Sequence, residues 1–530
     1  MNLIISSLRI PVEKDGVDEY LKAASHMLKI REQDITVVKI LSKSLDVSCK
    51  DQFYYDISLV VTTPDTFDNG QNLPVYIEEL KEDRQEKKIE ERPIIVGFGP
   101  AGMFAALELI DYGIKPIIFE RGKKIEERSI DVHRFIKERV LDPESNIQFG
   151  EGGAGSYSDG KLFSRAKTKN STYINRVLDT FIKFGAPEEI GYVSKPHLGT
   201  DVLCRIVRNI RSYILERGGE IYYGSKMSDI LISDDKVSGV VINGEKEYRS
   251  STVYLAVGHS ARDSFEMFHK KGIAIEQKPI SVGVRVEHPV ETINLIRYGD
   301  KYKNYPGIGA AAYSFNYTNR KAGRGVYTFC MCPGGEVVIA SSEDGMMVVN
   351  GMSYSSRSSE FSNSALVVTC HTDDYRSTDP LAGIEFQKGI ERKAFNAGGG
   401  RWEVPAQNLI DFLSGRTSVD LNKNSFKMGA SPADMKEIFP KFISEALLNA
   451  FKSWEEDYPL FVSDHAILLG AETRTSSPVR MKRNERYESV NIKNLYPIGE
   501  GSGYTGGITS SAADAIKAVE ISLAGIEDTS

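Results

Sequence analysis

Apolar and polar positions follow two different periods over the first 80 residues. An alternation with a period of two predicts strands in LIISSLRIPV, ITVVKILSKSLDVSCK and FYYDISLVVTT. The segment GVDEYLKAASHMLKI repeats its apolar residues every three to four positions, which predicts a helix with one apolar face: Val17, Leu21, Ala24 and Leu28. We therefore expect a small α/β domain over residues 1–80.

This pattern breaks in EELKEDRQEKKIEER, residues 78–92, which is dense in charge and has no apolar stripe. Such a stretch is typical of a solvated segment. We interpret it as a linker helix and place a charged linker at residues 81–92.

The pattern changes again at Pro93. PIIVGFGPAGMFAALELIDYGIKPIIFERG predicts strand, glycine turn, helix and strand, and the unbroken apolar run Ile94–Val96 suits a strand buried on both faces. Residues 199–219 predict an amphipathic helix that Thr200 or Asp201 could cap. The tail SSAADAIKAVEISLAG predicts a helix with four apolar residues on one face: Ala512, Ile516, Val519 and Leu523.

Between these helices, the segment GEIYYGSKMSDILISDDKVSGVVINGEKEYRSSTVYLAVG predicts short strands with hairpin turns at Asp234-Asp235 and Asn243-Gly244. The middle third of the chain, about 280–470, mixes strands with polar loops and shows no repeat.

Composition bounds the function. The chain has 530 residues, enough for roughly two to four domains, and its 26% charged residues are typical of a soluble globular protein. A net charge of −7 argues against a general affinity for nucleic acid. Five cysteines are too few for a disulfide framework and fit a reducing cytoplasm. We expect no signal peptide and no membrane span.

A glycine motif follows the strand at Ile94–Val96. In Gly97-x-Gly99-x-x-Gly102, the first glycine allows a tight turn, the second lets backbone approach a pyrophosphate, and the third lets helix and strand pack closely. The helix N-terminus then offers free N–H groups to the anion. Glu120 ends the next strand, where its carboxylate can accept hydrogen bonds from both ribose hydroxyls and would repel a 2′-phosphate. The motif therefore predicts FAD or NAD rather than NADP.

Two further glycine-rich segments favour FAD, which is long and needs contacts from distant parts of the chain. They are FGEGGAGSYSDGKLFSR, residues 149–165, and LYPIGEGSGYTGGITSSAADAIKAVE, residues 495–520. Glu500 can reach ribityl or pyrophosphate-side hydroxyls, and the Gly506-Gly507 turn with the following helix start can stabilise negative charge at the flavin pyrimidine edge. The cofactor-binding residues that we predict are Gly97, Gly99, Pro100, Ala101, Gly102, Glu120, Arg121, Gly152, Gly153, Ala154, Gly155, Gly258, Gly499, Glu500, Gly506, Gly507 and Ile508.

Several motifs together resemble a known family. The glycine motif with its distal glutamate, TVYLAVGHSARD and the C-terminal IGEG are similar to the glutathione-reductase-type FAD superfamily. More narrowly, FGEGGAGSYSDGKL, KPHLGTD, YTFCMCPGG, NGMS and TRTSSPVR resemble bacterial FAD-dependent dehydrogenases (NAD/FAD-utilizing dehydrogenases) of unassigned substrate, which also carry a small N-terminal α/β domain. The resemblance implies a flavoprotein oxidoreductase. Members of the superfamily more often carry aspartate where Glu500 stands.

The chain has one GxGxxG motif and no CxxxxC pair after it. Reductases with a fixed NADPH domain carry a second glycine motif, so NAD(P)H as electron donor would have to use a shared or transient site. Without the cysteine pair, we do not expect disulfide-reductase chemistry.

Cys330 and Cys332 stand one residue apart in YTFCMCPGG. We expect strands at Val326–Cys332 and 337–341 to form a hairpin around the turn Pro333–Gly335, with both thiols on one face. Two thiols cannot complete a zinc site, and we assign no metal; a disulfide between residues two apart would be strained. Buried structural thiols are one interpretation, and a thiol that contacts the substrate beside the flavin is the other.

The basic segment ETRTSSPVRMKR, residues 472–483, leads into the C-terminal strand. Arg474 or Arg480 could bind a carboxylate or phosphate of the substrate bidentately, and a solvated basic loop is the alternative. Without them, the anchor is to be sought near Lys161 or Arg357.

The catalytic candidates are therefore Arg474, Arg480, Cys330, Cys332 and Lys161. His197 and His259 lie in glycine-flanked loops and are either acids or hydrogen-bonded structural residues.

These features predict an α/β fold. A Rossmann-type, glutathione-reductase-like FAD-binding domain is expected at residues 93–285 and 471–530, with an inserted α+β substrate domain at 286–470. The predicted function is hydride transfer through flavin N5 to or from a small anionic molecule. Two alternatives stay open: an O₂-using monooxygenase or oxidase, and a flavin-bearing RNA-associated or scaffold protein that binds its partner through residues 1–80.

Overall fold

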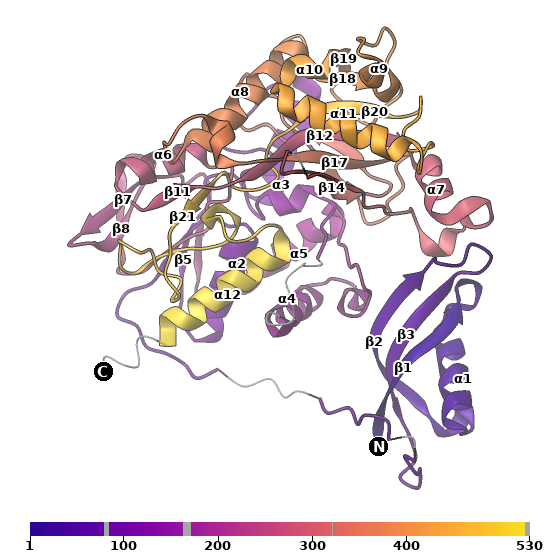
Figure 1. The fold of residues 1–530 in the computed structure, drawn as a ribbon. Helices are drawn as coiled ribbons and strands as arrows, with labels where there is room; N and C mark the ends of the chain where they lie inside the picture. The colour runs from indigo at the N-terminus through magenta and orange to yellow at the C-terminus, as the bar shows by residue number, and fades with distance from the viewer. Residues whose placement is uncertain (71, 79–83, 163–170, 321, 525–530) are drawn as a thin grey trace.

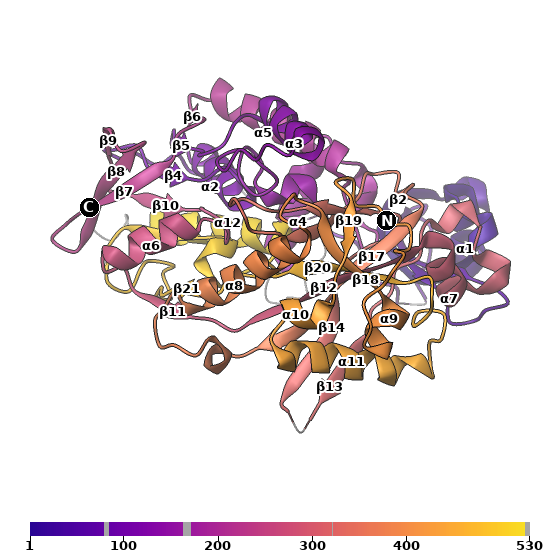
Figure 2. The same cartoon turned by 90° about the horizontal axis from the view of Figure 1, so that it is seen from above.

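A five-stranded parallel sheet and a seven-stranded sheet form the body of the computed structural model, and a three-stranded sheet stands beside them (Figure 1). Figure 2 shows the same arrangement from above, with the N-terminal sheet at one edge. The structure describes residues 1–70, 72–78, 84–162, 171–320 and 322–524. Across those residues, no helix combines the length and the apolar character needed to cross a bilayer.

The N-terminal unit is an antiparallel sheet, in the order β1-β3-β2, with one helix packed on it. Its elements are β1 (Asn2–Pro11), α1 (Val17–Leu28), β2 (Thr36–Asp46) and β3 (Tyr54–Thr62). The predicted order of strands and helix is confirmed. One detail was wrong: Val17 is 53% exposed, and Tyr20 is buried in the apolar face of α1 instead.

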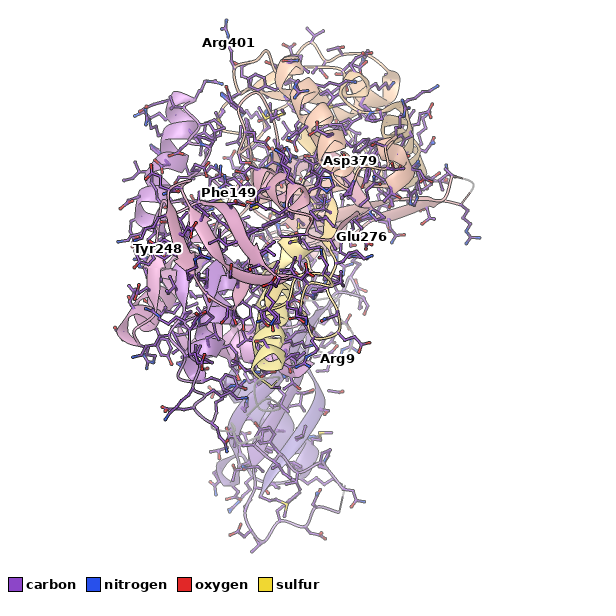
Figure 3. The ribbon with its side chains drawn as sticks, turned by 90° about the vertical axis from the view of Figure 1, so that its left-hand side faces the viewer. Arg9, Phe149, Tyr248, Glu276, Asp379 and Arg401 are labelled. Carbon is purple, nitrogen blue, oxygen red and sulfur yellow. The ribbon has the colours of Figure 1, made fainter. Side chains whose placement is uncertain are left out.

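The N-terminal unit rests on α7 (Val290–Tyr302). The rings of Phe53 and Tyr302 stack with centroids 4.2 Å apart, and the Tyr302 hydroxyl donates to a Glu13 carboxylate oxygen at 2.6 Å. Seen from the side, Arg9 of β1 lies in this separate unit, whereas Phe149 lies in the middle of the body (Figure 3).

The charged stretch at residues 84–92 forms no helix, so the predicted linker helix is wrong for this described part; residues 79–83 lie outside the described residues. Two arginines of this stretch form ion pairs with carboxylates of the body. Arg84 pairs with Glu108 and Glu520 at 2.6 and 2.8 Å, and Arg92 pairs with Glu220.

The parallel sheet, in the order β22-β10-β4-β5-β6, joins strands from distant parts of the chain. The strands are β4 (Ile94–Val96), β5 (Ile117–Phe119), β6 (Glu220–Tyr222), β10 (Val253–Leu255) and β22 (Leu495–Pro497). Because successive side chains point to opposite faces, both faces bury apolar residues.

Helices cover one face of this sheet, and a small antiparallel sheet with one helix covers the other. On the first face lie α2 (Pro100–Asp111), α4 (Ser171–Lys183), α5 (Thr200–Glu216) and α12 (Ile508–Ala524). On the second lie β7 (Met227–Ser233), β8 (Lys236–Ile242), β9 (Lys246–Arg249) and α6 (Arg262–Lys270). The remaining helix of this region is α3 (Ile125–Glu138).

Most local predictions for this region are confirmed. All four predicted apolar residues of α12 are buried, and the two hairpin turns have the positive φ angles that such turns require, for example +52° at Asp234 and +53° at Asn243. The predicted caps of α5 are wrong. Gly199 is the N-cap, Thr200 donates to the Ser158 carbonyl, and Asp201 accepts from Ser355.

The seven-stranded sheet, in the order β13-β14-β17-β12-β20-β18-β19, forms the second half of the body. Its strands are β12 (Ile280–Pro289), β13 (Asn316–Asn319), β14 (Arg324–Cys332), β17 (Phe361–Cys370), β18 (Val404–Asn408), β19 (Ala430–Pro432) and β20 (Ile467–Glu472). Its helices are α8 (Ala382–Ala397), α9 (Leu409–Ser414), α10 (Met435–Ile438) and α11 (Lys441–Glu455). Strands β12 and β20 each span a predicted domain boundary, at residues 285/286 and 470/471 respectively.

The predicted hairpin around Pro333–Gly335 is wrong. Strand β14 pairs with β13 and β17, while β15 (Glu336–Ile339) pairs with β16 (Val349–Met352). The two strands that flank the turn therefore belong to different sheets. A second short antiparallel pair consists of β11 (Ile275–Gln277) and β21 (Val479–Met481). In the sequence, β11 comes before the strands of the seven-stranded sheet and β21 comes after them.

Candidate active site

A cavity of about 970 Å³ lies between the parallel sheet and the seven-stranded sheet, within the ~300–1,000 Å³ that is typical of small-molecule sites. We call one side, residues 97–101, 153–155, 499–500 and 504–508, the glycine wall. We call the other side, residues 159–161, 328–333, 350–351, 357, 472 and 474–475, the polar wall.

Most of the predicted site residues line this cavity. From the cofactor set these are Gly97, Gly99, Pro100, Ala101, Glu120, Arg121, Gly153, Ala154, Gly155, Gly258, Gly499, Glu500, Gly506, Gly507 and Ile508. From the catalytic set they are Lys161, Cys330, Cys332 and Arg474. The structure does not place Gly102, Gly152 or Arg480 in the lining.

The N-terminus of α2 opens onto the glycine wall. Gly99 is its N-cap and no side chain caps it, so N–H groups of the first turn remain available to an anion. A Cβ atom at Gly102 would lie 2.0 Å from the carbonyl oxygen of Gly97. Only glycine at this position lets the helix pack so closely on its strand.

Glu120 follows β5 and is 4% exposed. Its Oε1 accepts from the backbone N–H groups of Gly122 and Gly150 at 2.9 and 3.0 Å, and its Oε2 accepts from Phe98 N–H at 2.8 Å. A carboxylate oxygen can accept two hydrogen bonds, so Oε2 keeps acceptor capacity in the cavity lining.

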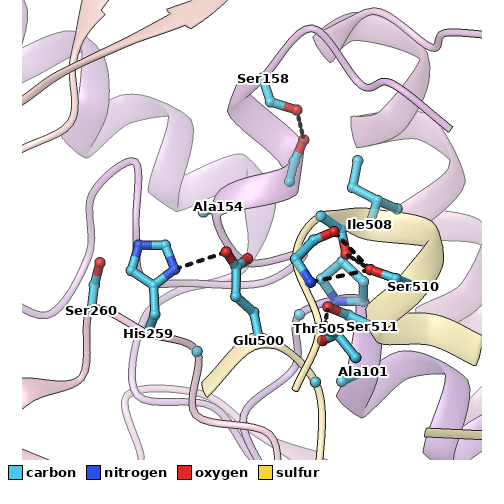
Figure 4. Close-up of a pocket in the computed structure, with 18 of the residues that line it drawn as sticks. Ala101, Ala154, Ser158, His259, Ser260, Glu500, Thr505, Ile508, Ser510 and Ser511 are labelled. Carbon is cyan, nitrogen blue, oxygen red and sulfur yellow. Dashed lines mark hydrogen bonds and ion pairs between the residues drawn. The ribbon is translucent and has the colours of Figure 1, made fainter. Parts of the chain in front are cut away.

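A second helix N-terminus, that of α12, meets the same cavity. The Ser510 hydroxyl donates to the Gly506 carbonyl at 2.7 Å and so holds the glycine turn against the helix start. Figure 4 shows Glu500 and His259 facing each other beside this turn, with His259 Nδ1 3.4 Å from Glu500 Oε1. The buried Nε2 atom of His259 has no hydrogen-bond partner among the described residues.

Arg128 of α3 is a residue that the sequence analysis missed. Its guanidinium is fully buried beneath the glycine-rich loop and donates to the carbonyl oxygens of Asn146, Ile147, Glu151 and Gly153 at 2.7–3.0 Å. The arginine therefore fixes the loop that carries Gly153 to the cavity. A single arginine in a charged helix pattern gave no signal for this role.

Cys330 and Cys332 lie in the polar wall, but not as a regular strand would place them. The register of β14 against β17 shifts between Phe329 and Cys332, and Cys330 has a φ of +42°, so the strand bulges at the first cysteine. The expectation that both thiols share one strand face is therefore wrong. Burial raises the pKa of Cys330 to about 12 and also raises the pKa of Cys332, which keeps both thiols protonated.

Arg285 of β12 lies behind these cysteines and was also missed. It is fully buried, forms an ion pair with Glu472, and donates to the Cys330 carbonyl at 2.8 Å and to Asn350 Oδ1 at 2.7 Å. One signal was available: a lone arginine in the strand sequence SVGVRVEHP, because a buried charge is rarely left without a partner.

The predicted anion-binding arginines do not present free guanidinium groups. Arg474 lines the cavity, but it pairs with Glu391 Oε2 at 3.1 Å and donates to the Ser342 hydroxyl at 2.6 Å. Glu391 is shared with Arg262 at 2.6 Å. Arg480 is absent from the lining, and its guanidinium lies 3.3 Å from Glu276.

Lys161 lines the cavity, with its ammonium 2.8 Å from Asp159 Oδ2. His197 lies close by, because its backbone forms an isolated antiparallel β-bridge with the backbone of Lys161. Burial, followed by the charge of Arg357, lowers the pKa of His197 to about 4. This histidine is therefore neutral near pH 7. It does not line the cavity.

Part of the chain matches a known protein family, and nearly the whole chain matches one known protein. Residues 279–475 match a family described as "FAD-dependent protein, C-terminal domain-like". A Clostridium beijerinckii protein, itself described as uncharacterized, is 41% identical over 529 residues, which is 98% of each chain. This chain and the Clostridium beijerinckii protein belong to one family. With the FAD-dependent domain at residues 279–475, the chain is an FAD-dependent oxidoreductase.

More distant similarities were also found for this FAD-dependent protein. Thiamine thiazole synthase of Pyrococcus horikoshii is 27% identical over 150 residues, 28% of this chain and 45% of that protein. A geranylgeranyl bacteriochlorophyll reductase-like protein of Thermoplasma acidophilum has a TM-score of 0.35 at 12% identity, covering 82% of this chain and 79% of that one. The halogenase PltM in complex with FAD has a TM-score of 0.37 at 10% identity, covering 82% and 70%.

The residues of the FAD-dependent protein fit the cofactor. Two helix N-termini, the open acceptor position of Glu120 and His259 Nε2, which has no partner in the described part of the chain, meet in or beside one cavity. A pyrophosphate and sugar hydroxyls are groups that these donors and acceptors would satisfy.

Proposed function

We propose that this protein transfers hydride between FAD and a small anionic molecule, as one of the bacterial FAD-dependent dehydrogenases of the glutathione-reductase-type superfamily. The observation that supports this most is the cavity itself. Its glycine wall carries helix N-termini and backbone donors, and its polar wall carries buried charges and thiols.

FAD supplies hydride chemistry at flavin N5 when it is bound. Residues Gly97–Ala101 would hold the pyrophosphate at the start of α2, and Glu120 would accept from the adenosine ribose. Glu500, with His259 beside it, would hold ribityl hydroxyls. The turn Gly506–Ile508 at the start of α12 would face the pyrimidine edge, where a helix N-terminus favours negative charge.

The proposed domains are 1–80, the linker 81–92, 93–285 with 471–530, and 286–470. Support comes from the parallel sheet, which combines strands from 94–96 through 495–497. Strands β12 and β20 extend the seven-stranded sheet past the inner boundaries. We further propose a cytoplasmic location, and NAD(P)H as a donor that visits a transient site.

The first experiment identifies the flavin and its redox stoichiometry. Acid precipitation of the purified protein should release FAD to the supernatant, because no covalent attachment is proposed. In a separate titration of the intact, FAD-loaded protein, complete reduction by dithionite should take two electrons per FAD. Recovery of FMN, or of no flavin after reconstitution, contradicts the proposal, and uptake of four electrons would show that Cys330 and Cys332 form a second redox centre.

The second experiment identifies the reaction. The holoprotein is photoreduced without oxygen and then mixed with a panel of carboxylic acids, phosphorylated metabolites and neutral compounds. Reoxidation by an anionic compound supports the proposal. Reoxidation only by O₂, with peroxide formed, would instead favour an oxidase.

A further inference from the structure

Four residues meet at the polar wall, and we call them the Asp159 cluster: Asp159, Lys161, Ser353 and Arg357. Asp159 Oδ2 lies 2.8 Å from Lys161 Nζ and 2.8 Å from Arg357 Nη2. The Ser353 hydroxyl donates to the other carboxylate oxygen. Asp159, Lys161 and Arg357 all line the cavity.

The backbone around the cysteines brings Arg357 to this wall. A Cβ atom at Gly334 would lie 1.9 Å from the carbonyl oxygen of Arg357, so the glycine lets the turn after Cys332 pack directly on the arginine backbone. Gly334 also has a φ of +54°, which favours glycine. The CPGG turn therefore holds the Arg357 backbone at the polar wall, which also carries the two thiols.

The cluster carries one positive charge more than it carries negative charges. Lys161 and Arg357 share the single carboxylate of Asp159, which is 3% exposed. These two cations hold the pKa of Asp159 below its usual range, so the carboxylate is ionised at neutral pH. Burial lowers the pKa of Lys161, but the Asp159 carboxylate 2.8 Å away raises it and favours the charged ammonium. The net charge of the cluster is therefore +1.

The surroundings inside the cavity do not cancel this charge. Arg285 and Glu472 form a neutral pair, and Cys330 and Cys332 stay protonated because burial raises their pKa values. Asp201 is exposed, lies outside the cavity lining and is bound by Ser355.

Two buried nitrogen atoms at the cluster lack partners. Within the described residues, neither Arg357 Nε nor His197 Nε2 makes a hydrogen bond. Arg357 Nε–H is a donor that cannot lose its proton, and buried donors are nearly always paired in native structures. A ligand that accepts hydrogen bonds would satisfy it.

We propose that the Asp159 cluster binds a carboxylate group of the substrate through Lys161 and Arg357. Asp159 holds the two cations together and leaves one positive charge for the ligand. The inference rests on the proposed function, because it names the substrate class of the same cavity.

A carboxylate fits this charge better than a phosphate. A carboxylate carries one negative charge and two acceptor oxygens, which match a net charge of +1 and the two cationic donors. A phosphate monoester carries about −1.5 to −2 at pH 7, so it would leave uncompensated negative charge in a buried site.

The test compares benzoate with its neutral isostere benzamide, and with inorganic phosphate, on the FAD-loaded protein. Binding is followed by the visible absorbance of the flavin and, separately, by isothermal titration calorimetry. The variants are Lys161→Gln and Arg357→Gln. The control is Lys195→Gln, which removes an exposed cation at the rim of the same cavity.

We expect benzoate to bind at least tenfold more tightly than benzamide and phosphate. Each cluster variant should weaken benzoate binding by roughly 10- to 100-fold, as loss of a charged hydrogen bond does, and Lys195→Gln should leave it unchanged. Tighter binding of phosphate, or equal benzoate affinity in wild type and both variants, overturns the assignment.

Flavin content and melting temperature are measured for every variant. Where Arg357→Gln fails to fold, Arg357→Lys keeps the charge but loses Nε, and it should still weaken benzoate binding; unchanged affinity there also overturns the assignment. Failure of the proposed function is separate: a wild type that binds no FAD but still discriminates benzoate from benzamide in the calorimeter contradicts the flavin chemistry and leaves the carboxylate site supported.

Discussion

The five-stranded parallel sheet and the seven-stranded sheet differ in what they bury. The central strands of the parallel sheet, such as Ile94–Val96 and Val253–Leu255, bury apolar residues, with the lone hydroxyl of Tyr254 as the polar exception. In the seven-stranded sheet, β12 buries Arg285, Glu287 and His288, each 0% exposed, within one strand. One sheet is therefore stabilised by apolar packing, and the other depends on how its buried charges are paired.

The two walls of the cavity differ in the same way as the two sheets. The glycine wall is made of backbone atoms above an apolar sheet, so its chemistry is set locally by the glycine motif. The polar wall is made of side chains whose charges are balanced by residues far away in sequence, such as Glu472 for Arg285 and Arg357 for Asp159.

The largest effect is expected from breaking a buried ion pair in the seven-stranded sheet. Arg285→Met leaves Glu472 buried without its partner, which should lower the free energy of unfolding by about 3–5 kcal/mol. Urea denaturation measures this.

The matched change in the parallel sheet is Ile95→Val, a buried residue that loses one methylene. It should cost only about 0.5–1.5 kcal/mol. Equal losses in the two variants would remove the contrast between the sheets.

A pH-dependent effect is expected at Glu287. Burial raises its pKa to about 7, while Ser425 holds it by two hydrogen bonds. The folded state then keeps a proton that the unfolded state has lost between pH 4.5 and about 7, so stability falls as the pH rises through this window. Glu287→Gln should raise the unfolding free energy at pH 8 by up to roughly 3 kcal/mol and change it little at pH 4.

Thermal unfolding across pH 4–8 checks this. A wild-type slope that persists unchanged in Glu287→Gln would assign the pH dependence to another group.

A further loss of stability is expected behind the glycine wall, where Gly102→Ala should cost about 1–3 kcal/mol by overpacking. Its added Cβ atom must push α2 away from Gly97, so FAD affinity should fall at least tenfold. The ratio of flavin to protein absorbance measures FAD content. Gly389→Ala in α8 is the control, since no heavy atom beyond its own stretch of helix lies within 4 Å of the added Cβ atom. Retention of FAD by Gly102→Ala would contradict the proposed role of this packing.

Much of the glycine half could be predicted from the sequence because its signals are local. The turn at Gly97, the helix that follows it and the hairpin at Asn243-Gly244 each depend on residues within a few positions. Tertiary context changed only details, such as the cap of α5, where Ser355 takes the carboxylate of Asp201 that the helix end was expected to use.

The polar wall could not be predicted in the same way. Nothing in the sequence places SDGKL and NGMS beside the strand predicted in YTFCMCPGG, and only the fold shows that these segments surround Asp159 and Cys332. The turn at Pro333–Gly335 favours a hairpin because it lies between two strand patterns, yet β14 pairs with β13 and β17 instead.

The placement of β22 and α12 has a consequence for biosynthesis. During translation the chain emerges from its N-terminus at about 5–20 residues per second, and β22 and α12 come from residues 495–497 and 508–524. Until they leave the ribosome, β10 is an unprotected sheet edge and the apolar side of α2 faces solvent. A nascent chain cannot close its cavity before β22 and α12 have been made, so cofactor loading must come after these residues have left the ribosome.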